Sequence, residues 1–130
     1  MPRSRPLDFD QNAASAAIVV LLTLTAVMLL ALFTRTEPHP PLIVAPFALA
    51  PFLGASLAVG LAALRLAGQG ARSSAALMVL FAATALVSFG PQKYFDAAFP
   101  LIWPAVITAQ AAIAVLLVYG MRTLLGARQT

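Results

Sequence analysis

The sequence predicts an all-α integral membrane protein, a four-helix transmembrane bundle with both termini in the cytoplasm. Of its 130 residues, 62% are hydrophobic and only 9% are charged, whereas about a quarter of a soluble domain is charged. The ionisable residues are bunched, and they leave four uncharged runs of 20 to 25 residues. About 20 apolar residues suffice for one helix to cross a bilayer. This pattern excludes a soluble globular domain, a disordered tail and a free nucleic-acid binder.

We place the four spans near residues 13–33, 42–64, 73–89 and 99–119, within a single membrane domain that covers residues 1–130. The runs do not alternate between apolar and polar residues, as the strands of transmembrane barrels do, so we predict helices. The connections between the spans are short, about 8–12 residues, which favours one domain.

The first span has Arg3 and Arg5 before it, as a signal peptide would. The apolar core of a signal peptide is about 7–15 residues long and precedes a small-x-small cleavage site. Here the apolar stretch covers residues 13–33 and is followed by FTRTEPHP. We therefore predict a retained span.

The second span carries small residues every four positions, a spacing that lets helix backbones approach closely. The stripe consists of Ala50, Gly54, Ala58 and Ala62, with Ser56 and Gly60 on an adjacent stripe. The simpler interpretation is packing within this bundle. The alternative is a seam for a partner subunit or a second copy of the chain.

Prolines gather in the two outer loops and in the outer halves of the second and fourth spans. Inside a helix, Pro51 would free the carbonyl of Phe47, and Pro104 would free that of Pro100. One interpretation is an outward-facing vestibule lined by irregular backbone. The simpler one is that these prolines begin helices, where they cost little; Pro51 fits it least well.

The third span is followed by an outer loop rich in aromatic residues, GPQKYFDAAFPLIWP. Tyr94 and Trp103 are of the type that prefers the headgroup level of a membrane. If the segment is helical, Lys93 and Asp96 are spaced to form an ion pair. We interpret the loop as an interfacial anchor, with a docking or ligand site as the alternative.

The fourth span contains Gln110 near its middle. A buried amide needs hydrogen-bond partners, so we expect Gln110 to bond between helices, with a ligand or pore role as the alternative. None of the four spans contains an ionisable residue, whereas ion paths and proton relays in membranes use such residues. The sequence therefore disfavours ion-coupled transport.

No catalytic, cofactor-binding or metal-binding residues are predicted. The chain has no cysteine and one histidine, His39, in the loop RTEPHPP beside Glu37. Two candidate ligands do not make a closed metal site, which usually takes four, and bis-histidine haem ligation would need a second histidine.

The orientation follows from the basic residues, which concentrate on the cytoplasmic side of membrane proteins. Two of them, Arg35 and Lys93, lie in the first and third loops. The formal net charge of +4 is thus an orientation signal, and it also favours anionic lipid headgroups. The other six lie in the two termini and the middle loop: Arg3, Arg5, Arg65, Arg72, Arg122 and Arg128.

In length and number of spans the chain resembles the small multidrug resistance transporters, four-helix homodimers whose coupling depends on a glutamate inside the first span. The corresponding stretch here, IVVLLTLTAVMLLALF, has Thr23 and Thr25 and no acidic residue. The resemblance covers architecture alone and does not imply cation–proton antiport.

We therefore expect a multi-pass protein of a bacterial plasma (inner) membrane, since seven Arg against one Lys suggest a GC-rich genome. The predicted function is that of a small non-catalytic accessory or assembly subunit of a larger membrane complex. The alternative is a homo-oligomeric carrier or flippase for a lipid-like or neutral solute; an enzyme is least favoured. The expected partners are membrane lipid and other subunits or further copies of the chain. The candidate partner or ligand contacts are Gln110, Trp103, Tyr94, Lys93, Asp96, Pro51, Gly54 and Ala58.

Overall fold

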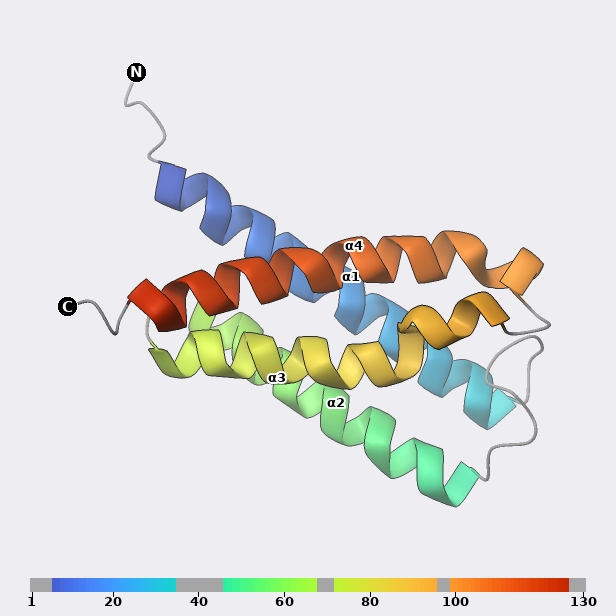
Figure 1. Ribbon diagram of the computed structural model, residues 1–130. Helices are drawn as coiled ribbons and strands as arrows, with labels where there is room; N and C mark the ends of the chain where they lie inside the picture. Colours follow the sequence, from blue (N-terminus) through green and yellow to red (C-terminus); the bar gives the residue numbers. More distant parts are fainter. Residues whose placement is uncertain (1–5, 35–45, 68–71, 96–98, 127–130) are drawn as a thin grey trace.

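A computed structural model describes residues 6–34, 46–67, 72–95 and 99–126, and over these ranges the chain is helical except for a bend at Gly90 (Figure 1). The α-helices are α1 (Pro6–Thr34), α2 (Pro46–Leu66), α3 (Arg72–Phe89) and α4 (Phe99–Gly126), and a 3-10 helix, η2 (Pro91–Phe95), follows α3. All four α-helices are long and apolar enough to cross a membrane. The predicted number and type of spans are thus confirmed, and the fold is that of a multi-pass helical membrane protein.

Two of the helices are longer than predicted. At 1.5 Å per residue, α1 is about 43 Å long and α4 about 42 Å, against a hydrocarbon core of about 30 Å. The uncharged part of α1 begins only after Asp10. The first turns of α1 instead contain Pro6, a residue type that suits a helix start, and two aspartates, a residue type favoured near the N-terminus of a helix.

Each helix packs mainly against the helices next to it in the chain, and α4 completes the bundle by packing against α1. In Figure 1, α1 and α2 run obliquely to α3 and α4, and the start of α1 lies at the same end of the bundle as the end of α4. Both ends of the described chain therefore emerge on one side, as four spans require. Below, this is called the terminal end, and the opposite end is called the loop end.

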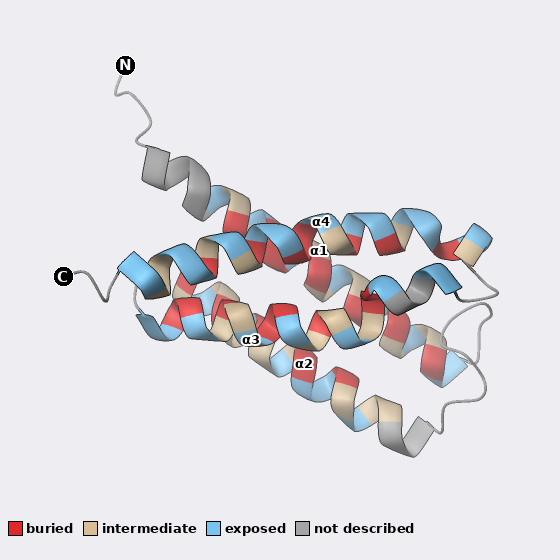
Figure 2. Ribbon diagram, in the orientation of Figure 1, coloured by how far each residue is buried: buried red, intermediate tan, exposed pale blue. Residues whose placement is uncertain are grey.

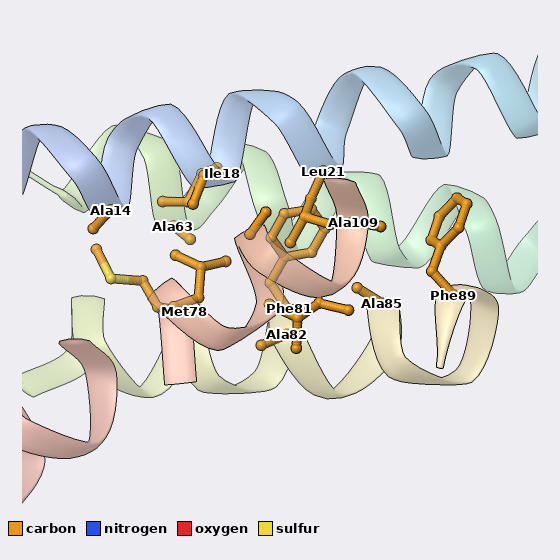
Figure 3. Packing of buried hydrophobic residues seen from close by; sticks show 14 of the residues in the cluster. Ala14, Ile18, Leu21, Ala63, Met78, Phe81, Ala82, Ala85, Phe89 and Ala109 are labelled. Carbon is orange, nitrogen blue, oxygen red and sulfur yellow. The ribbon is translucent and has the colours of Figure 1, made fainter. Parts of the chain in front are cut away.

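The core is narrow and centred on Phe81 of α3, whose side chain is fully buried. Figure 3 shows its ring among Leu21 of α1, Ala109 of α4 and other buried residues. Large apolar side chains also cover the outside, for example Leu30, Phe33 and Leu101, and Figure 2 shows exposed residues along every helix. Such a surface is suited to lipid rather than water.

Two glycines allow helices to approach closely. A Cβ added to Gly60 of α2 would lie 2.7 Å from side-chain atoms of both Leu22 and Phe81. One added to Gly120 of α4 would lie 2.7 Å from Val79 and 3.2 Å from the carbonyl oxygen of Ala75 on α3. Because helices in lipid associate through close packing, these glycines are structural contacts of the bundle.

Candidate functional site

The loop end of the bundle is held together by a polar cluster around Gln110. The Tyr94 hydroxyl of η2 donates a hydrogen bond of 2.6 Å to Gln110 Oε1. Gln110 Nε2 donates one of 3.3 Å to the carbonyl oxygen of Phe89, one of the carbonyls that a helix end leaves without an intrahelical partner. Gln110 therefore joins α4 to the end of α3 and to η2, as expected of an amide that bonds between helices.

Aromatic residues surround this cluster at the loop end. The rings of Tyr94 and Phe99 are 5.2 Å apart at an interplanar angle of 52°, an arrangement within the favourable range for aromatic pairs. Trp103 and Phe95 are exposed, as an interfacial anchor requires. Lys93 lies in η2, but its side chain is outside the described set, and Asp96 lies outside the described residues, so their predicted ion pair stays a prediction.

Prolines begin several elements and also occur inside two of them. Pro46 begins α2 and Pro91 begins η2, as the simpler interpretation predicts. Pro51 and Pro104 instead lie within α2 and α4, each within the first two turns. The described residues around them are helical, so they do not form the irregular backbone that an outer vestibule was expected to have.

The middle of the small-residue stripe of α2 faces outward, whereas Ala50 and Ala62 at its two ends are half-buried. Gly54 and Ala58 are exposed, as is Pro51, and a Cβ added to Gly54 would meet nothing within 4 Å. The expectation that this stripe packs within the bundle is therefore wrong for Gly54 and Ala58. The adjacent pair, Ser56 and Gly60, is buried and supplies the internal packing.

Several hydroxyl side chains in the described spans form hydrogen bonds, either between helices or to the backbone of their own helix. Ser56 of α2 bonds to Thr84 of α3 with 2.8 Å between the hydroxyl oxygens, and Thr84 donates in turn to the carbonyl of Phe81. Thr23 and Thr108 donate to carbonyls four residues earlier in their own helices. These polar groups are used for structure, and sequence spacing alone did not reveal the Ser56–Thr84 bond.

At the terminal end an apolar groove of about 330 Å³ lies between α1 and α4. Sequence reasoning did not find it, because its residues look like ordinary lipid-facing positions; only Arg122 stands out, at the end of the fourth uncharged run. It is lined by Ala13 of α1 and by Ala114, Val115, Val118, Tyr119 and Arg122 of α4.

The loop containing Glu37 and His39 lies outside the described residues. Among the residues that the structure describes, no three His, Cys, Asp or Glu side chains come together as a metal site would require. Comparison with models of protein families, with curated proteins and with solved structures found no match to this chain. The functional argument therefore depends on the chain's own geometry.

Proposed function

We propose that this protein is a non-catalytic accessory or assembly subunit of a larger complex in a bacterial inner membrane, with both of its termini in the cytoplasm. The observation that carries the proposal is the outward stripe of α2, where Gly54 and Ala58 present almost no side chain to the surroundings. Small residues at a membrane surface let a neighbouring helix approach closely. A transmembrane helix of a partner subunit fits this surface.

The packing of α2 supports the proposal independently of residue type. Within the bundle, 22% of the α2 span is buried, whereas the other spans are 33% to 39% buried. α2 is therefore the span that the rest of the bundle buries least, which leaves it free to pack against a partner. The Ser56–Thr84 bond shows that the inner face of the same helix is already occupied.

The experiment is purification of a tagged protein, expressed at its native level, in mild detergent. We expect larger membrane proteins to co-purify in fixed stoichiometry. Gly54→Leu and Ala58→Leu should remove these partners, because a bulky side chain on the stripe holds a neighbouring helix away. Ala83→Leu, at an exposed position near the middle of α3, is the matched control and should retain them.

Two results would contradict the proposal. The tagged protein emerging alone, or only with further copies of itself, would exclude a subunit of a larger complex. Equal loss of partners in the Ala83→Leu control would show that the α2 stripe is not the interface.

The carrier hypothesis relied on Gln110 as a polar contact for a solute. The amide oxygen of Gln110 accepts a hydrogen bond from Tyr94, and its amide nitrogen donates one to the carbonyl of Phe89. This favours a structural role for Gln110. Gln110→Leu should therefore lower stability by about 1 kcal/mol while co-purification persists at low temperature. Loss of solute flux from an otherwise stable Gln110→Leu protein in proteoliposomes would support the carrier instead.

A further inference from the structure

The groove between α1 and α4 combines apolar walls with one cation at its mouth. Ala114, Val115 and Val118 provide its walls on α4, and Arg122 lies at the terminal end. Arg122 is exposed, and among the residues whose side chains the structure describes, no acidic one lines the groove. The lining therefore leaves the guanidinium available to an anion.

The dimensions of the groove indicate what can occupy it. From Ala114 to Arg122 the α4 backbone rises about 12 Å, slightly less than one leaflet of a hydrocarbon core about 30 Å thick. The groove has a volume of about 330 Å³. This length and volume suit a thin, flexible acyl chain.

We propose that this groove binds an anionic phospholipid, with an acyl chain along Ala114, Val115 and Val118 and the headgroup phosphate at Arg122. Arginine forms paired hydrogen bonds with phosphate oxygens, and a basic residue at the membrane surface favours anionic lipid. Tyr119, half-buried beside Arg122, has the amphipathic ring typical of the headgroup level. This site is at a distance from the α2 stripe and does not depend on the proposed function.

The test is native mass spectrometry of the full chain in mild detergent, with equal amounts of dioleoylphosphatidylglycerol and dioleoylphosphatidylcholine added. We expect the wild type to retain the anionic lipid preferentially. Arg122→Gln should lower this preference about fivefold, as expected from one basic residue at the membrane surface. Arg65→Gln removes an exposed arginine at the terminal end of α2, outside the groove, and should leave the preference unchanged.

A second pair of variants tests the groove itself. Ala114→Phe should reduce retention of both lipids by filling the groove, whereas Ala111→Phe, at an exposed position on α4 outside it, should not. Val118→Phe gives an independent filled groove if Ala114→Phe does not fold. The proposal is overturned by equal retention of the two lipids in the wild type, or by equal effects of Arg65→Gln and Arg122→Gln. It is also overturned by a lipid-free dimer that Ala114→Phe dissociates, since a second copy would then occupy the groove.

Discussion

Gly54 and Gly60 of α2 are the same residue type in very different surroundings. Six residues apart, they point in directions about 120° apart around the helix. A Cβ added to Gly54 would meet nothing within 4 Å, whereas one added to Gly60 would lie 2.7 Å from both Leu22 and Phe81. The outer face of α2 is thus open for a partner, and the inner face is filled to contact distance by two other helices.

This difference shows what distinguishes inside from outside in a bundle that is apolar all round. In water, burial follows hydrophobicity, but lipid is as apolar as the core, so association depends on close packing and hydrogen bonds. The inner face of α2 has both, through Gly60 and through the hydroxyl of Ser56. The same packing rule predicts distinct effects of substitution on the two faces.

The largest effect is expected when the aromatic ring that packs against Gly60, that of Phe81, is removed. Phe81→Ala should lower the free energy of unfolding by about 3 kcal/mol, near the bottom of the range for aromatic truncation in soluble cores. The value is low because the apolar segments of the unfolded protein stay covered by detergent, so that mainly the packing contacts are lost. The measurement is denaturant unfolding of the detergent-solubilised protein, followed by circular dichroism.

Phe95→Ala is the matched control, since Phe95 is 93% exposed. We expect it to change the free energy of unfolding by less than about 0.5 kcal/mol. If the two truncations have equal effects, the ring of Phe81 is not packed more tightly than an exposed ring. The inner face of α2, which contacts Phe81, would then not be the tightly packed face.

An intermediate effect is expected when a side chain is added at Gly60, where the neighbouring side chains leave no space for it. Gly60→Leu should cost about 2 kcal/mol, because the added side chain must displace Leu22 and Phe81. Gly54→Leu places the same side chain in open space and should be tolerated within about 0.5 kcal/mol. The same unfolding measurement compares the two variants directly.

The double variant Gly60→Leu with Phe81→Ala sharpens this test. Because the new leucine would occupy space that the ring leaves, the double variant should be more stable than the sum of the single effects predicts by about 1 kcal/mol. Strict additivity would mean that Gly60 and Phe81 do not share one space.

The sequence predicted the four helices because uncharged length alone identifies a span. It missed the start of α1 and the end of α4, since Pro6 lies before Asp10 and Gly126 lies after Arg122, and a helix can continue past the charged residues that bound an uncharged run. It also left two orientations open for Gly54 and Ala58, and the simpler one, packing within the bundle, is not the one that the structure shows. The reason is that apolar residues on every side of α2 leave no polar face to mark the outside.

Contacts between distant segments were the least predictable part. The need of Gln110 for partners was foreseen, but Tyr94 reaches it only because η2 follows α3 directly. The groove of α1 and α4 depends on how two helices from opposite ends of the chain diverge. No local pattern in the sequence records that relation, so the arginine at its mouth could be interpreted only as an orientation signal.

The smallest effect tests whether the hydroxyl pair helps to fix the inner face of α2. Thr84 donates to the Phe81 carbonyl, so Ser56 is the donor in the bond between the two hydroxyl oxygens. Ser56→Ala should cost about 0.6 kcal/mol, the average for interhelical hydrogen bonds in membranes. In a double-mutant cycle with Thr84→Val, the coupling energy should be similar to that value, because the two substitutions remove one shared bond. The control is Thr23→Val, which removes only a bond within α1 and should show no coupling to Ser56→Ala. Equal coupling energies in the two cycles would mean that the Ser56–Thr84 bond does not join the two helices.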